Sequence, residues 1–243
     1  MTIVHDYPMR SVPTVNRLIE ALPRRERARL LNGCVTVDFV AGEVLCSTGQ
    51  PVEFAWFPLS GLIFRGARVA DHPTVQIGMT GNEGMLGEIL MIGGGTSPWR
   101  AECQSDGTAL RIPAADFLEL VGECPALEET AFQYLYSMIS MASRTTPCTR
   151  FHGVEARLAR WLLMTDDRTR ADHFNLTHQF LAEMLGVQRS AVTLAAGALQ
   201  ALGVIHYSRG RISILSRPGL EDISCACYRD SERTHIGQYA EGA

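Results

Sequence analysis

The stretch LAEMLGVQRSAVTLAAGALQALGVI, residues 181–205, restricts the fold more than any other part of this sequence. A short apolar-periodic segment runs into Gly186, and a second segment led by Arg189 starts after only two intervening residues. Glycine readily takes the positive φ that reverses a chain at a helix end. The sequence therefore predicts two helices joined by a sharp turn, the first beginning near Thr177, whose hydroxyl can cap it.

The second of these helices is predicted to have one buried and one exposed face. Its exposed face carries small and polar residues, so its backbone can approach the base edges of a DNA major groove closely. The following run VIHYSRGRISIL predicts a hairpin turning at Arg209 and Gly210, which would make a winged helix-turn-helix. This second helix is predicted to end at Gly203. The residues of its apolar face, which are assigned to the core, are Val192, Ala196, Leu199 and Leu202. The residues expected to contact DNA are Thr177, Gln188, Arg189, Ser190, Thr193, Leu194, Ser208, Arg209 and Arg211.

Charge is distributed unevenly along the chain. The formal net charge of −4 does not by itself favour a nucleic-acid partner. Residues 152–217 carry eight arginines against five acidic residues, whereas residues 1–151 carry 12 against 16 and residues 218–243 carry two against five. The basic excess lies where DNA contact is expected. An ordinary helical hairpin in a core, and a helix-turn-helix that binds only protein, are the alternatives.

The N-terminal half predicts an all-β unit. TVNRLIEALPRRERARLL indicates two short helices broken at Pro23. From Gly33 to about Ile112, short strand-like runs alternate with glycine-containing turns, as in an antiparallel roll or barrel. A cupin-like metalloenzyme would need clustered histidine and glutamate ligands, and this region has only His72, so no enzyme is expected. The strand-like runs are VTVDFV, EVLC, FAWFPL, LIFRGARV, TVQIGM and TALRI.

A long helix is predicted from Cys124 to about Phe151, followed by another in GVEARLARWLLMTDD. The long helix has a main apolar stripe and a flanking stripe containing Phe132 and Ile139. A helix with two apolar stripes needs two partners, which the β unit and a second copy of the chain would supply. The alternative is one amphipathic helix on one core. The main stripe is assigned to the dimer interface: Leu127, Ala131, Leu135, Met138 and Ala142.

The sequence contains no apolar run near the roughly 20 residues that span a bilayer, and its N-terminus lacks the pattern of a signal peptide. A cytoplasmic protein without membrane contact is therefore expected. Its seven cysteines are odd in number and scattered, which predicts reduced thiols. Cys225 and Cys227 are interpreted as packing residues of a terminal helix, because two thiolates without a second pair make a weak metal site. His5, His72 and His152 are isolated in sequence. No metal site and no cofactor are predicted.

The order of these parts resembles the Crp/Fnr family of bacterial transcription regulators over nearly the whole chain. The resemblance rests on AGEVLCSTGQ, FAWFPLSGLI, GNEGMLGEIL and LTHQFLAEMLGVQRSAVTLAAGALQALGVI in this order and spacing. It implies an α+β protein with a cyclic-nucleotide-binding-like β-roll (jelly roll) in residues 1–123, a dimerisation helix in 124–151 and a winged helix-turn-helix in 152–243. It also implies a homodimer that binds an inverted-repeat operator in double-stranded DNA, with RNA polymerase as a further candidate partner.

The signal pocket departs from the pattern of the cAMP-sensing members. In those members a Gly-Glu-Leu stretch is followed by an Arg-Ser or Arg-Thr pair that grips the cyclic phosphate. Here the first part is preserved, but no arginine stands in register after it. A cyclic phosphate without a buried cation would be poorly compensated, which argues against cAMP. The resemblance assigns the effector pocket to Gly87, Glu88, Ile89, Ser97 and Arg100.

Two further comparisons with the family concern the signal and the operator. The effector is left unknown, and a redox or gas sensor of the same fold using cysteine or haem is the alternative. Residues 1–33 contain no cysteine, which excludes the family's N-terminal iron-sulfur site. Arg189 matches the base-reading arginine of the family, whereas Ser190 and Leu194 replace its acidic and second basic readers. The operator sequence is therefore expected to differ.

Overall fold

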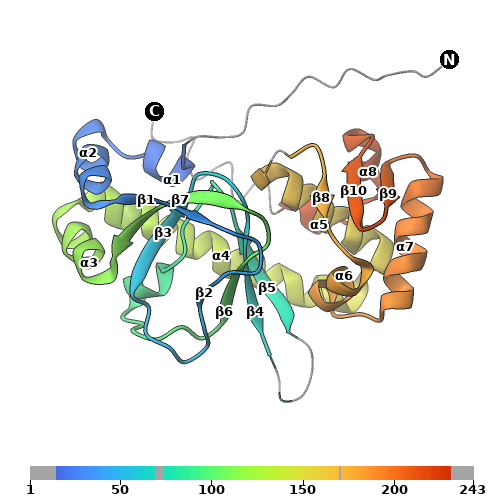
Figure 1. Ribbon diagram of the computed structural model, residues 1–243, viewed down its shortest axis with the longest axis horizontal. Helices are drawn as coiled ribbons and strands as arrows, with labels where there is room; N and C mark the ends of the chain where they lie inside the picture. The colour runs from blue at the N-terminus through green and yellow to red at the C-terminus, as the bar shows by residue number, and fades with distance from the viewer. Residues whose placement is uncertain (1–14, 69, 71–73, 170, 231–243) are drawn as a thin grey trace.

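The computed structural model describes residues 15–68, 70, 74–169 and 171–230. Figure 1 shows a β-rich N-terminal part, a helical C-terminal part, and a long helix, α4, running behind the first toward the second. The predicted α+β fold class is confirmed. The N-terminal elements are α1 (Arg17–Glu20), α2 (Arg24–Gly33), β1 (Val35–Phe39), β2 (Val44–Cys46), β3 (Phe54–Pro58), β4 (Ile63–Ala67), β5 (Val75–Thr80), η1 (Glu88–Ile92), β6 (Arg100–Cys103), β7 (Gly107–Pro113) and α3 (Ala114–Glu123). The remaining elements are α4 (Pro125–Phe151), α5 (Val154–Thr169), β8 (Phe174–Asn175), α6 (His178–Leu185), α7 (Arg189–Ala201), β9 (Ile205–Ser208), β10 (Arg211–Ile214) and α8 (Arg217–Ile223).

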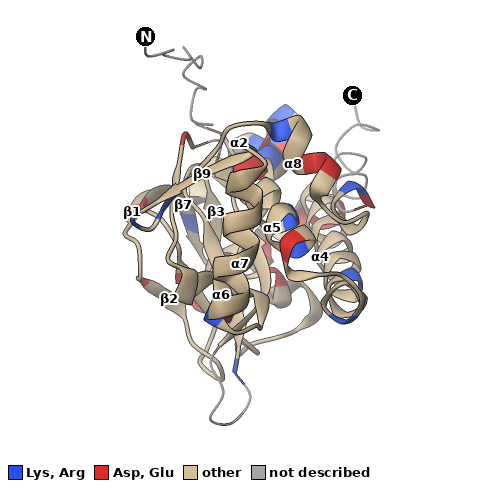
Figure 2. Ribbon diagram, turned by 90° about the vertical axis from the view of Figure 1, so that its right-hand side faces the viewer, with Lys and Arg blue, Asp and Glu red and all other residues tan. Residues whose placement is uncertain are grey.

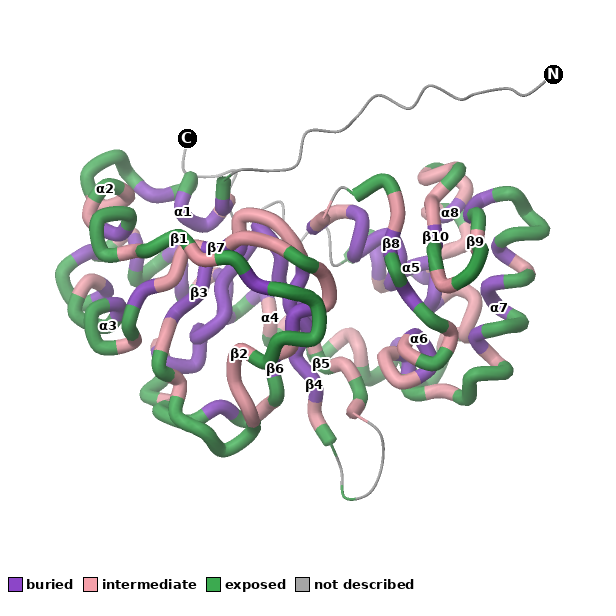
Figure 3. Tube along the Cα trace, in the orientation of Figure 1, coloured by how far each residue is buried: buried purple, intermediate pink, exposed green. Residues whose placement is uncertain are grey.

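Two antiparallel sheets form the β-roll. Their strand orders are β1-β7-β3 and β2-β6-β4-β5, and β3 and β4 are largely buried (Figure 3). The six strand-like runs of the sequence correspond to β1 to β5 and β7, so the predicted all-β unit is confirmed. Pro23 directly precedes α2, which confirms the predicted break between the first two helices. Strand β6 falls outside the predicted runs because its inward residues, Ala101 and Cys103, give a weak apolar signal.

Helix α4 packs its main apolar stripe against the chain's own β-roll. Leu127 and Ala131 have no exposed surface, and Leu135 is 9% exposed. The assignment of Leu127 and Ala131 to the dimer interface is therefore wrong, because the β-roll already covers them. Leu135 is also largely buried within the single chain, which leaves little of it for a partner. Met138 is half-buried against the same core, and Ala142 is exposed on the wall of a cavity further along the helix.

The flanking stripe of α4 is the one that stays exposed. Phe132, Tyr136 and Ile139 are 42%, 66% and 58% exposed. Their spacings of four and three residues place them on one face of the helix. The helix thus has the two apolar stripes that its sequence predicts. The chain's own core covers the main stripe, and the flanking stripe faces away from that core.

One hydrophobic core cluster spans the β-roll and the helical part. Phe64 of β4 packs on Trp161 of α5 and on Phe180 of α6, with ring centroids 5.7 and 5.5 Å apart. Beside this cluster, Arg168 Nε of α5 lies 2.7 Å from Glu83 Oε1, and both side chains are buried. These contacts fix α5 and α6 directly against the sheet that contains β4 and β5. No helix in the described ranges is long and apolar enough to cross a bilayer.

Candidate nucleic-acid interface

The turn between α6 and α7 has the geometry that its sequence predicts. The Thr177 hydroxyl accepts a hydrogen bond of 3.1 Å from the Phe180 N–H and so caps α6. Gly186 has φ 63°, a left-handed conformation in which a side chain would add strain. The Val187 N–H then bonds the Ala182 carbonyl at 2.9 Å, which closes the helix end as in a Schellman motif. Helix α7 starts directly after Gln188, so the predicted helix-turn-helix is confirmed.

Helix α7 separates buried from exposed residues along its length (Figure 3). Val192, Ala196 and Leu199 are buried as expected, but Leu202 is 61% exposed. The placement of Leu202 on the inward face is wrong because α7 ends at Ala201 and Leu202 follows it as the C-cap. Helix α7 contains no acidic residue. This can be followed in Figure 2, where α6 and α7 face the reader and acidic residues are red. The predicted DNA-contacting residues Gln188, Arg189, Ser190, Thr193 and Leu194 are all exposed on it or at its start.

A histidine that the sequence interpretation missed holds the exposed face in place. His178 stacks on Tyr207 of β9, with ring centroids 4.3 Å apart. Its Nδ1 lies 2.9 Å from the Thr193 hydroxyl, which itself donates toward the Arg189 carbonyl at 3.0 Å. Burial, and then the positive charge of Arg189, hold the pKa of His178 below its usual value, so the ring is neutral at pH 7. The sequence signal was slight: His178 only follows the capping Thr177.

The wing is the three-stranded sheet β8-β10-β9. Its tip turns at Arg209 and Gly210, which have φ values of 50° and 81°, and this confirms the predicted hairpin. Ser208, Arg209 and Arg211 are all exposed. The wing is held by two contacts: the Tyr207 N–H bonds the Gln200 side chain at 2.7 Å, and Arg211 lies 2.9 Å from His173 Nδ1. These contacts hold the exposed arginines of the wing in place beside α7.

The β-roll contains the predicted effector pocket, with one change of residue. A cavity of about 180 Å³ is lined by Gly87, Glu88, Ile89 and Ser97, but not by Arg100. Arg100 pairs with Glu102 at 2.9 Å on the exposed side of β6. Its assignment to the pocket is wrong because side chains alternate along a strand, and β6 turns its residues 101 and 103 inward.

A different arginine lines this cavity. Arg111 of β7 lies over the rings of Phe54 and Trp56, 4.3 and 5.2 Å from their centroids. Three glutamates also line this cavity. The sequence signal for Arg111 was a single charged residue within the strand-like run TALRI, which does not say which face it occupies. The glutamates are Glu43, Glu53 and Glu88.

A buried polar network joins the cavity to α4. Glu88 is fully buried, and its Oε1 lies 3.4 Å from Arg65 Nε of β4. Arg65, also buried, donates a hydrogen bond of 3.1 Å to the Tyr134 hydroxyl of α4 and contacts Thr80. The loop at Gly84 passes so close to α4 that a Cβ there would lie 2.1 Å from the Tyr134 ring. A glycine is therefore required where the β-roll meets the network.

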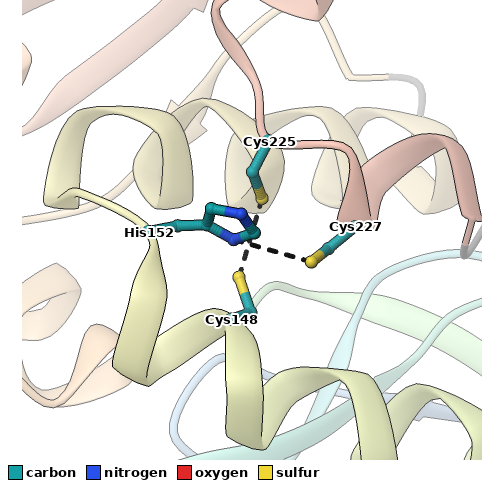
Figure 4. Close-up of side chains that lie close together, drawn as sticks. All are labelled: Cys148, His152, Cys225 and Cys227. Carbon is teal, nitrogen blue, oxygen red and sulfur yellow. Dashed lines mark hydrogen bonds between the residues drawn. The ribbon is translucent and has the colours of Figure 1, made fainter.

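The last turn of α4 and the segment after α8 bring four potential metal ligands together (Figure 4). They are Cys148, His152, Cys225 and Cys227, and their ligand atoms all lie within 4.8 Å of one another. Cys225 and Cys227 are interpreted from the sequence as packing residues because they lack a second pair of ligands, and the structure supplies such a pair in Cys148 and His152. His5 and His72 lie outside the described residues. A hydrogen bond with Cys225 lowers the pKa of Cys148, whereas the same bond, followed by burial, raises the pKa of Cys225.

Family models match both parts of the chain. Residues 36–124 match the cyclic nucleotide-binding domain, and residues 156–223 match the Crp-like helix-turn-helix domain. The first match covers most of the β-roll and the second covers α6, α7 and the wing. No curated protein sequence matches the chain.

Solved structures repeat this arrangement over nearly their full length. FixK2 from Bradyrhizobium japonicum is 15% identical, with a TM-score of 0.68 and coverage of 79% of this chain and 98% of that chain. TTHA1359, a transcriptional regulator of the CRP/FNR family from Thermus thermophilus, is 25% identical, with a TM-score of 0.66 and coverage of 78% and 98%. The regulator CLP from Xanthomonas campestris, described as c-di-GMP responsive, is 17% identical, with a TM-score of 0.66 and coverage of 80% and 100%. A cyclic nucleotide-binding domain followed by a Crp-like helix-turn-helix, in the fold of these regulators, shows that the chain belongs to the Crp/Fnr family of transcription regulators.

Proposed function

We propose that this regulator binds an inverted-repeat operator as a homodimer, with α7 of each subunit in one of two successive major grooves. The observation that carries the proposal is the exposed face of α7, which is free of acidic residues and bears small side chains around Arg189. Such a face lets the helix backbone approach the bases. The exposed stripe of Phe132, Tyr136 and Ile139 on α4 supports pairing with a second copy.

The exposed residues of the module divide into base readers and phosphate contacts. Arg189 stands at the start of α7, where its guanidinium can bond guanine O6 and N7. Leu194 is 77% exposed, which is unusual for a leucine and suits contact with a thymine methyl group. The remaining predicted contacts position the protein on the backbone or at the edge of the site: Thr177, Gln188, Ser190, Thr193, Ser208, Arg209 and Arg211.

Arg189→Ala should weaken operator binding by about 1–3 kcal/mol, because a bidentate contact with a base is lost. Arg209→Ala is the matched control, since it also removes one exposed arginine, but from the wing tip. The control should weaken binding to operator and random duplexes alike. The operator is first selected from genomic fragments with the purified dimer. Fluorescence anisotropy at one fixed salt concentration then compares both variants on the operator and on a random duplex of equal length.

The ratio of the two affinities decides the assignment of Arg189. Loss on the operator but not on the random duplex supports base reading. An equal loss on both duplexes would make Arg189 a phosphate contact. Failure to enrich any genomic fragment would contradict specific DNA binding itself and would favour a helix-turn-helix that binds protein.

We further propose that the β-roll cavity does not respond to cAMP. Among its described lining residues, Arg111 is the only cation, and it already stacks on Phe54 and Trp56. Glu43, Glu53 and Glu88 border the same space, and their charges oppose that of a cyclic phosphate. A buried phosphate needs charge-assisted hydrogen bonds that this lining supplies poorly. Contact with RNA polymerase stays a prediction of the family resemblance.

Millimolar cAMP should therefore leave operator affinity unchanged. A ligand shifts the DNA-binding equilibrium only if its affinities for the DNA-binding and non-binding states of the protein differ. No such difference is expected for cAMP, because the cavity is not expected to bind it. Anisotropy titrations of the operator with and without cAMP measure this, and calorimetry measures direct binding. A micromolar cAMP constant together with cAMP-dependent operator binding would contradict the proposal and would point to Arg111 as the phosphate ligand.

A further inference from the structure

Four side chains from two distant segments form a group with the composition of a metal site (Figure 4). Cys148 and His152 come from the last turn of α4 and its C-cap, and their spacing of four residues places them on one side of the helix. Cys225 and Cys227 come from the segment that follows α8. We propose that these four residues bind one tetrahedral metal ion, with Zn²⁺ as the ion that this ligand set fits best.

The distances within the group suit a single ion. Cys148 Sγ lies 3.6 Å from Cys225 Sγ, and Cys227 Sγ lies 3.6 Å from His152 Nδ1. Sulfur ligands at about 2.3 Å and a nitrogen at about 2.0 Å from a tetrahedral zinc ion are separated from each other by roughly 3.5–3.8 Å. An iron-sulfur cluster places several iron and sulfide atoms between its cysteines and needs a wider space. Two opposite edges of the group thus already have the lengths of a zinc tetrahedron.

The ligand types select the same ion. Three thiolates and one imidazole form the Cys3His set of closed, structural zinc sites. Hard cations such as Mg²⁺ and Ca²⁺ prefer oxygen ligands, and none of the four donors is an oxygen. All four positions of the tetrahedron come from the protein, which leaves no open position for a substrate. The site is therefore a structural or regulatory one.

The surroundings balance the charge of such a site. A divalent ion with three thiolates and a neutral imidazole has a net charge of −1, which is costly to bury alone. Arg160 of α5 is 6% exposed, and it lines the same cavity as Cys148. Its Nε has no hydrogen-bond partner among the described residues. A buried arginine with unused donor capacity is the partner that an anionic metal site requires.

The position of the group gives the ion a mechanical role. Cys148 and His152 end the long helix that packs on the β-roll, and Gly153 separates them from α5. Cys225 and Cys227 belong to the chain that leaves the helix-turn-helix domain after α8. One ion bound by both pairs would tie the end of α4 to the DNA-binding domain across this junction. Metal binding would thus fix how the two α7 helices of a dimer are presented.

The test uses metal content and Co²⁺ spectra of the full-length protein. The purified, reduced chain should contain one zinc ion per subunit, and Co²⁺ added to the chelated protein should give thiolate charge-transfer bands and the visible bands of a tetrahedral site. Cys225→Ser and His152→Ala should each weaken Co²⁺ binding by more than the roughly 10–100-fold that changes around a site cost. Cys34→Ser is the matched control, because Cys34 lies at the end of α2, outside the group, and should leave binding unchanged.

A second variant separates loss of metal from loss of fold. His152→Cys keeps four ligands, so it should bind Co²⁺ with a spectrum shifted toward that of a four-thiolate site. Retention of metal by His152→Cys and loss by His152→Ala supports the proposal. Unchanged Co²⁺ spectra in Cys225→Ser, or no tetrahedral bands in the unmodified protein, would overturn it. Iron together with acid-labile sulfide would also overturn the single-ion site and replace it by a cluster. None of these readouts depends on DNA binding.

Discussion

Arg65→Met should lower the free energy of unfolding by about 3–5 kcal/mol, because it removes the cation from a buried ion pair and leaves the partner charge behind. Glu88 is fully buried, and Arg65 Nε is 3.4 Å from its carboxylate. Methionine preserves much of the side-chain volume, so the loss reports charge more than packing. The hydrogen bond from Arg65 to the Tyr134 hydroxyl is lost as well. Urea unfolding followed by circular dichroism measures the change.

The double variant Arg65→Met with Glu88→Gln tests the cause of this loss. Removing both charges should recover a substantial part of the stability, since no uncompensated carboxylate is then buried. Arg100→Met is the matched control: Arg100 pairs with Glu102 at the exposed surface, and its removal should cost less than about 1 kcal/mol. If Arg65→Met were no more destabilising than the control, or the double variant recovered nothing, the buried pair would not be a major source of stability.

Ile139→Glu should dissociate the proposed dimer. In a pair of α4 helices, each new carboxylate would be buried in the seam without a counter-ion, at a cost that exceeds the apolar gain of the stripe. Ile139 is 58% exposed in the single chain, so the substitution should leave the fold intact. Two linked half-site contacts exceed one by about 10²–10⁴ in affinity. Operator binding should therefore fall by at least about 100-fold, and sedimentation should give a monomer.

The control for this variant is Leu118→Glu, which places the same charge on an exposed leucine of α3. It should remain a dimer and bind the operator normally. If Ile139→Glu remained a dimer, with a melting temperature like that of the unmodified protein, the flanking stripe of α4 would not be part of the interface. The same charge at Leu135 would be a poor test, because this residue is only 9% exposed in the single chain and its change should also destabilise the fold.

Local patterns in the sequence were enough to predict the elements and their order. The turn at Gly186, the cap at Thr177 and the wing turn at Arg209 each depend on residues within a few positions, and the structure confirms them. The two stripes of α4 were also visible in the sequence. Their partners were not, because periodicity shows that a face is apolar but not which surface will cover it.

The lining of the pocket and the cysteine group are two further features that could not be predicted from the sequence. Arg100 and Arg111 both lie in strands, and a register shift of one residue decides which of them faces the cavity. Cys148 and Cys225 are 77 positions apart, so neither half of the group resembles a metal site by itself. Only the packing of the segment after α8 against the end of α4 brings the halves together. Such contacts depend on tertiary structure, which no local pattern records.

The aromatic contact of Phe64 with Trp161 and Phe180 has a consequence for cooperativity. The core cluster that contains these residues also includes Leu62 and Met79 of the β-roll, so apolar surface of both parts is removed from water together. Separating the DNA-binding domain would expose that surface on each side, at a cost proportional to its area. Unfolding of either part should therefore expose apolar surface of the other part as well.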